Sequence, residues 1–152
     1  ITLQAKYQTV LICLLKKSCD LKKLYVSVSS RVIENGRVLL TKRDMRFVRR
    51  LIRDYHFRDS SVEYTYYLWK GVRMGEDRYL FPHSHNADVR IDSIHPYEVS
   101  IFKDIAVKLL DHVGEDSIYY PSACELKDKL GKFISLSETD VPGQSLLKEF
   151  IG

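Results

Sequence analysis

The sequence predicts a mixed α/β domain that is rich in helix and has few strands. Two short segments alternate apolar and polar residues, as strands do: Leu24–Ser29 and Asp88–Asp92. Longer segments place apolar residues at helical spacing behind capping residues. The chain has 152 residues, 45% of them hydrophobic, which is enough for one compact domain with a real core.

Residues 1–23 fit either a helix or a strand and stay unassigned. The apolar residues between Leu3 and Leu15 fit the helical template, and Lys16 and Lys17 would suit the end of a helix because of its dipole. A strand is the alternative, because residues 9–14 form a short apolar run.

The next elements are a turn and a helix rich in arginine. Asn35 and Gly36 are a turn pair. Thr41, with Asp44 three residues later, resembles a capping box that begins the helix. On that helix the side chains at positions 45, 48, 52 and 55 share an apolar face. The opposite side carries four arginines: Arg46, Arg49, Arg50 and Arg53.

Four guanidinium groups on one side of a helix indicate an anionic ligand. Like charges one turn apart repel by a few tenths of a kcal/mol for each pair, unless an anion lies over them. A polyphosphate suits them, because guanidinium groups bind phosphate oxygens in pairs. The alternative is an ordinary solvated basic face.

Further helices are expected along the rest of the chain. Ser60 and Glu63 resemble a second capping box, for a helix that ends near Gly75. Pro96 suits the first turn of a helix with an apolar stripe, and Ser122 with Glu125 begins another helix that runs to about Ile134. Residues 140–144 form a turn, and residues 146–151 a short helical or extended end. The expected order is helix, strand, two helices, strand, helix, helix.

Composition and charge restrict the function classes. A net charge of +4 suits a small anionic ligand and is weak for a dedicated nucleic-acid binder. The cysteines, Cys13, Cys19 and Cys124, lack metal-type spacing, so a reduced, cytoplasmic protein is expected. No apolar run is long enough to span a membrane. Because the chain begins at Ile1, we expect it to be part of a longer polypeptide.

Other candidate sites are weaker. His83 and His85 near Asp88 could suggest a metal, but no third ligand follows at a telling spacing, so no metal site is expected. Trp69, with three nearby tyrosines (Tyr64, Tyr66 and Tyr67), could stack on a base, although core packing explains Trp69 better.

The sequence contains no phosphate-binding GxxxxGK[ST] loop. Its Gly131-Lys132 pair has Leu126 at the first glycine position and Phe133 at the hydroxyl position.

Three segments taken together resemble the uridine kinase family: Leu24–Ser29, Asp44–Arg58 and Leu68–Asp77. The similarity is to its bacterial nucleoside-kinase branch, which often carries a threonyl-tRNA-synthetase-like TGS domain upstream. It continues in order through Phe81-Pro82, Ala87–Val89, Pro96–Glu98 and Val141–Gly152. The resemblance therefore covers residues 24–152 and leaves out residues 1–23.

The resemblance implies the C-terminal portion of a P-loop kinase (Rossmann-like) fold, with residues 41–75 as its lid. The implied reaction transfers the γ-phosphoryl group of ATP, with Mg²⁺, to the 5′-hydroxyl of a pyrimidine nucleoside such as uridine or cytidine. Arg53 and Arg58 would contact the ATP phosphates, with Arg46 and Arg49 in the same binding set. Arg50 would lie between the nucleoside and the transferred group, so Arg50 and Arg53 are the catalytic candidates.

Two departures from the family limit this implication. The Walker loop and the aspartate base of the family have no match in residues 1–23, so the chain is not expected to turn over alone. Asp59 stands where the family commonly has glycine after the lid arginine. The alternative hypothesis is a non-catalytic module that keeps the basic lid and binds nucleotide, RNA or protein. Unburied apolar faces would favour a homo-oligomer.

Overall fold

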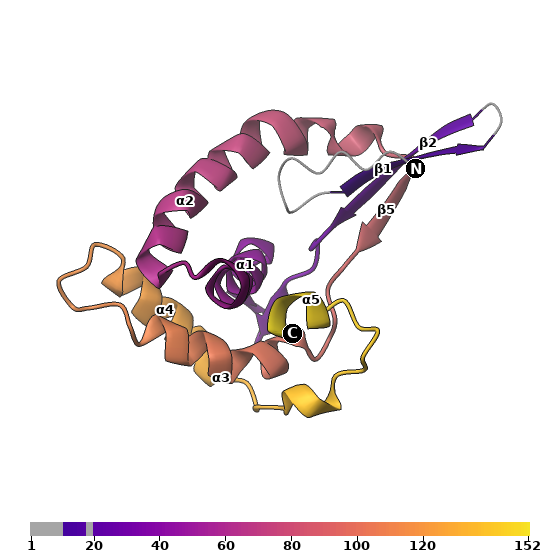
Figure 1. Ribbon diagram of the computed structural model, residues 1–152. Coiled ribbons are helices and arrows are strands. Elements are labelled where there is room, and N and C mark those ends of the chain that lie inside the picture. Colours follow the sequence, from indigo (N-terminus) through magenta and orange to yellow (C-terminus); the bar gives the residue numbers. More distant parts are fainter. Residues whose placement is uncertain (1–10, 18–19) are drawn as a thin grey trace. The chain divides into compact units, whose positions relative to one another are not determined.

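The computed structural model describes residues 11–17 and 20–152, and the chain divides into two compact units. The first unit contains residues 1–30 and 70–94, and the second contains residues 31–69 and 95–152. Helices and strands are both present (Figure 1), so the mixed α/β class is confirmed. Across the described residues, no helix combines the length and apolarity needed to cross a bilayer.

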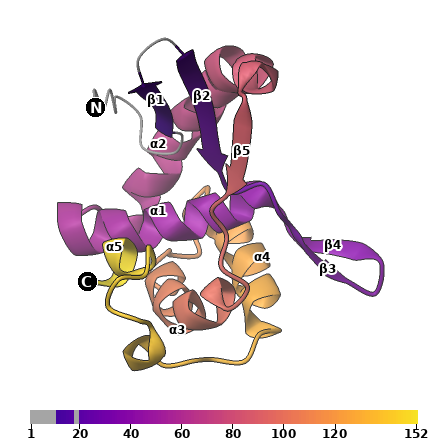
Figure 2. The same ribbon diagram turned by 90° about the vertical axis from the view of Figure 1, so that its right-hand side faces the viewer.

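The first unit contains a three-stranded sheet. Strands β1 (Leu11–Lys17) and β2 (Asp20–Ser27) are antiparallel, and β5 (Val89–Asp92) adds to β2 in the parallel direction (Figure 2). The two expected strands are thus confirmed, with β2 beginning earlier than expected. The unit also contains the end of α2 (Val62–Gly75), a π-helical turn η1 (Glu76–Leu80) and a 3₁₀ helix η2 (Phe81–Asn86).

The helix considered for the N-terminal part is wrong where the structure describes it. Leu11–Lys17 is a strand, as the alternative predicted, and Leu11 lies opposite Val26 in its pairing with β2. A short apolar run fits both templates, and pairing with a neighbouring strand decides between them. Residues 1–10 lie outside the described residues.

The second unit is built around α1 (Lys42–Arg58). Helices α3 (Glu98–Leu110) and α5 (Lys148–Ile151) contact α1, and α4 (Tyr120–Gly131) packs on α3 (Figures 1 and 2). Helix α2 (Val62–Gly75) begins in this unit and ends in the first. A 3₁₀ turn, η3 (Glu138–Asp140), precedes α5. Apolar side chains of these helices form the core of the unit: Met45, Val48, Leu51, Ile52, Phe102, Ala106, Leu109, Ala123, Leu126, Leu130 and Leu147.

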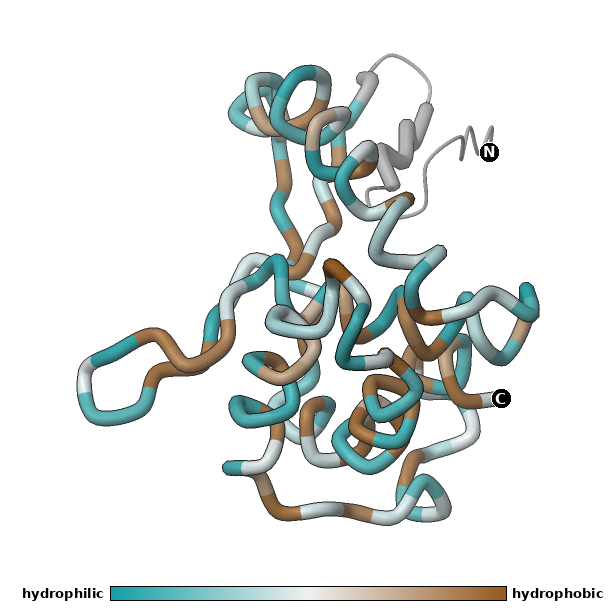
Figure 3. The backbone as a smooth tube through the Cα atoms, turned by 90° about the vertical axis from the view of Figure 1, so that its left-hand side faces the viewer, coloured by the Kyte–Doolittle hydropathy of each residue, from teal (hydrophilic) through white to brown (hydrophobic). Residues whose placement is uncertain are grey.

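A β-hairpin precedes α1, and its two strands were not predicted from the sequence. Strands β3 (Val32–Glu34) and β4 (Arg37–Leu40) are antiparallel, and the expected turn at Asn35-Gly36 joins them with φ angles of 49° and 77°. Positive φ at both positions is the geometry of a tight hairpin turn. Several residues of these strands are hydrophobic (Figure 3); Ile33 and Val38 are 56% and 46% exposed, whereas Leu40, next to α1, is fully buried. Strands of three and four residues are too short for alternation to reveal them.

Three helix starts differ from the sequence-based prediction. Pro96, expected in the first turn of a helix, lies just before α3, which begins at Glu98. Ser61, not Ser60, caps α2, and its Oγ accepts a hydrogen bond from the backbone N–H of Tyr64. Helix α4 begins at Tyr120, two residues before the expected cap, with Pro121 in its first turn. Proline fits the first helical turn because its missing N–H has no partner there.

Two aspartates fasten β5 to β2. At one end the carboxylate of Asp88 accepts the backbone N–H of Lys23 at 2.6 Å. At the other end Asp92 accepts the backbone N–H groups of Ser29 and Ile94, at 3.0 and 3.1 Å, and the hydroxyl of Ser30. Burial would raise the pKa of Asp92, but these hydrogen bonds outweigh it and hold the pKa below the ordinary 3.8.

Asp92→Asn should therefore lower the free energy of unfolding by about 1 kcal/mol at pH 7, since one acceptor oxygen and its charge are lost. A depressed carboxyl pKa stabilises the fold above the ordinary pKa, and this contribution disappears as the pH falls through the folded-state pKa. The difference from wild type should shrink below about pH 4 in urea titrations. Asp128→Asn on α4 is the control for the same charge change. A difference that persists unchanged at pH 2–3 would contradict this account.

Candidate anion-binding site

The arginine helix α1 begins as the sequence predicts. The Thr41 side chain accepts the backbone N–H of Asp44 at 3.1 Å, and the Asp44 carboxylate accepts the backbone N–H of Thr41 at 2.8 Å. This capping box satisfies two of the donors that a helix N-terminus leaves unpaired. The helix then runs to Arg58, four residues beyond Asp54.

No side of α1 between residues 45 and 54 is fully exposed to solvent. Met45, Val48 and Ile52 are buried as expected, whereas Tyr55, expected on the same face, is 48% exposed. The arginine side is buried or half-buried as well. An ordinary solvated basic face is therefore wrong for this stretch. The expectation of one continuous ridge also needs correction, because the four arginines fall into two sets.

The first set, Arg46 and Arg49, is buried within the second unit. Arg46 is 1% exposed, and its guanidinium carbon lies 5.9 Å from the centre of the Trp69 ring. Arg49 donates through Nε and Nη2 to the two oxygens of Glu98, at 2.5 and 2.6 Å. Such a two-bond pair between a guanidinium and a carboxylate is strong and fixes both groups. Sequence reasoning missed Glu98 as a partner, although an acidic residue in the first turn of a helix is a recognisable signal.

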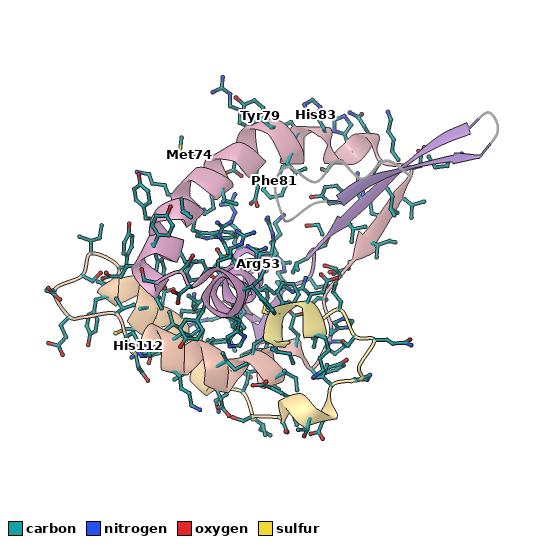
Figure 4. The ribbon with its side chains drawn as sticks, in the orientation of Figure 1. Arg53, Met74, Tyr79, Phe81, His83 and His112 are labelled. Atoms are coloured by element: carbon teal, nitrogen blue, oxygen red, sulfur yellow. The ribbon has the colours of Figure 1, made fainter. Side chains whose placement is uncertain are left out.

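The second set converges on one carboxylate, that of Asp54. Arg53 donates to Oδ1 of Asp54 through Nε at 3.1 Å and through Nη2 at 2.6 Å. Nε of Arg50 lies 3.0 Å from Oδ2, and Nη1 of Arg58 lies 3.3 Å from Oδ1. The side chains of Arg50 and Arg53 retain 16% and 14% of their exposure, and that of Arg58 retains 44%. Arg53 extends from α1 and is labelled in Figure 4.

These four side chains carry three positive charges and one negative charge. Burial lowers the pKa of Arg50, the neighbouring charges of Arg53 and Arg58 lower it further, and Asp54 acts in the opposite direction. Asp54 thus opposes the repulsion among the three guanidinium groups. Guanidinium groups gathered in this way suit a bound oxyanion.

The helix ends at Asp59 in a left-handed conformation. Its φ and ψ angles are 49° and 36°, and the backbone N–H groups of Asp59 and Ser60 both point to the carbonyl oxygen of Asp54. Glycine is the residue that adopts this conformation at least cost.

The aromatic residues of α2 divide between core and surface. Trp69 is 9% exposed and packs against Phe47, which supports core packing over base stacking. Tyr66 lies between Phe47 and Tyr119, and burial raises the pKa of its hydroxyl. Four aromatics within six residues of a helix cannot all be buried, and the two that remain exposed, Tyr64 and Tyr67, stack on each other.

The histidines near Asp88 do not form a metal centre in the part of the chain that the structure describes. His83 and His85 lie in the 3₁₀ helix η2 and not on a strand (Figure 4 labels His83). Among the described residues, no group of three His, Cys, Asp or Glu side chains could hold a metal ion. The Asp88 carboxylate instead binds the backbone of β2.

Three comparisons with known proteins were negative. No family model, no curated protein and no solved structure matches the chain.

The left-handed end of α1 yields a stability prediction. Asp59→Gly should raise the free energy of unfolding by about 0.5–1 kcal/mol, because glycine adopts positive φ without the contact of a Cβ atom. Asp59→Asn removes the same charge but keeps the side chain, so it should change stability much less. Equal effects of both variants in thermal denaturation would show that the charge, and not the backbone, limits this position.

Proposed function

We propose that the group formed by Arg50, Arg53, Arg58 and Asp54 binds the phosphates of a nucleoside triphosphate, in the lid of a uridine kinase-like nucleoside kinase. The observation that carries the proposal is the convergence of three guanidinium groups on one buried carboxylate, that of Asp54. The resemblance of residues 24–152 to the uridine kinase family supports the same role.

In phosphoryl transfer, negative charge spreads over the oxygens of the transferred group, and positive side chains placed around it stabilise the transition state. Arg50 and Arg53 are the side chains proposed for this work. Arg58, at the end of α1, would hold the more distant ATP phosphates. Arg46 and Arg49 take structural roles in this proposal, because the fold already buries them.

The proposal assigns the remaining catalytic parts to groups outside this sequence. The 152 residues contain no GxxxxGK[ST] loop to cradle the phosphates. Mg²⁺ would accompany ATP and be held mainly by phosphate oxygens, as is usual in kinases. The acceptor would be a pyrimidine nucleoside, on the strength of the resemblance alone.

A non-catalytic binding module remains the second candidate. The observation that favours it is the number of carboxylates already near the arginines: Glu98 pairs with Arg49, Asp54 lies among the other three, and Asp59 ends the helix. A module that recognises RNA would bind a single-stranded oligonucleotide more tightly than it binds tripolyphosphate. A kinase lid would show the opposite preference.

Arg50→Ala/Arg53→Ala should weaken tripolyphosphate and ATP binding at least about tenfold in calorimetric titrations, since each arginine supplies charge-assisted hydrogen bonds. The matched control is Arg31→Ala/Arg37→Ala, which removes the same charge from the exposed ends of the hairpin. Adding Asp54→Asn to the double variant tests whether an unpaired buried carboxylate, and not a lost ligand, causes the change. If the control variant binds tripolyphosphate equally weakly, the binding depends only on the general positive charge of the chain and not on a specific site.

A further inference from the structure

We propose that Glu98 is a positioning residue for this anion site. Through its pair with Arg49 it sets the rotation of α1 about the helix axis, and it thereby directs Arg50 and Arg53 toward the same anion. This inference rests on the proposed function, and it concerns a residue on a different helix from the arginines that bind.

The Glu98 carboxylate is held from both sides. It is fully buried in the first turn of α3, and both oxygens accept hydrogen bonds from Arg49. Oε2 also accepts the backbone N–H of His95 at 3.2 Å. This third bond comes from the same segment as Glu98, so the orientation of the carboxylate is fixed relative to α3.

The guanidinium group of Arg49 is contacted on its flat face as well as at its N–H groups. Its guanidinium carbon lies 5.4 Å from the centre of the Phe150 ring. That ring packs edge-on against Phe102 of α3, with centroids 5.9 Å apart. The carbonyl of Phe150 also lies 3.3 Å from Nδ1 of His56 on α1. Helices α3 and α5 therefore fix the Arg49 side chain together.

Fixing Arg49 fixes the direction of its neighbours. Consecutive residues of a helix are 100° apart, and residues four apart lie on the same side. Arg50 follows Arg49 directly, and Arg53 lies one turn later. A side chain ends about 6 Å from the helix axis, so a rotation of about 10° would move a guanidinium group by about 1 Å. Displacements of that size are enough to spoil a binding site.

Stability alone does not account for a buried ion pair. Removing charges from water costs several kcal/mol for each ion, and replacement of a buried pair by apolar residues of similar volume is often neutral or stabilising. A paired, two-bond geometry does fix orientation. A stabilising role and a positioning role for the Arg49–Glu98 pair therefore predict different results when both residues are replaced together.

The test uses Arg49→Met/Glu98→Leu in the full chain, a change that leaves the net charge unaltered. We expect a folded protein with somewhat lower thermal stability, because the backbone N–H of His95 loses its acceptor, and a dissociation constant for sodium tripolyphosphate that is at least about tenfold higher. Affinity within twofold of wild type, in a variant that is folded by circular dichroism, would overturn the positioning role.

Arg49→Lys decides the question if the double variant does not fold. It keeps both charges and exchanges the rigid two-bond fork for a flexible point charge. A loss of tripolyphosphate affinity of threefold or more, at unchanged secondary structure by circular dichroism, supports the inference, and an unchanged affinity overturns it. If the wild-type chain itself fails to bind tripolyphosphate, the proposed function falls and this inference falls with it.

Discussion

The second unit depends on two carboxylates that lie against a buried arginine helix. Between residues 45 and 54, α1 has no fully exposed side, yet it carries four arginines there. Guanidinium groups keep their charge in proteins, so burying them requires anionic or aromatic neighbours. Glu98, Asp54 and the Trp69 ring supply these neighbours. Helix α1 can therefore be central and basic at once.

The carboxylates of Glu98 and Asp54 face different numbers of guanidinium groups. Glu98 faces one guanidinium with two hydrogen bonds, so that pair is matched in charge and geometry. Asp54 is shared by three guanidinium groups, and burial together with their mutual repulsion lowers the pKa of Arg50. The same helix thus contains one two-bond ion pair and one group in which three guanidinium groups share a carboxylate. The second group is the one that we propose as the anion site.

The sequence predicted local features better than it predicted the neighbours of each side chain. The capping box at Thr41, the turn at Asn35 and the strands around residues 24 and 89 depend on nearby residues, and the structure contains them. The burial of Arg46 involves Trp69 on the next helix, α2, and the pairing of Arg49 involves Glu98 of α3, 49 residues away in the sequence. Helical periodicity assigns charged positions to solvent, so it could not reveal them.

The hairpin β3–β4 and the strand β1 show a second limit. The strands of the hairpin have only three and four residues, and β1 begins with an apolar run that does not alternate, so periodicity cannot separate strand from helix or from loop there. Pairing with another strand decides. Helical spacing grouped the arginines of the candidate site but did not reveal Glu98 as the partner of Arg49. In the sequence, Glu98 was noted only as the last residue of the Pro96–Glu98 segment.

The most direct test of the account follows the arginine Nε–H resonances of the chain by nuclear magnetic resonance while sodium tripolyphosphate is added. The account predicts that the Arg50 and Arg53 signals shift in a saturable manner, while the Arg49 signal, fixed by Glu98, stays nearly constant. If all arginine signals move together in proportion to ionic strength, or if none of them moves, α1 carries no specific anion site and the central claim is wrong.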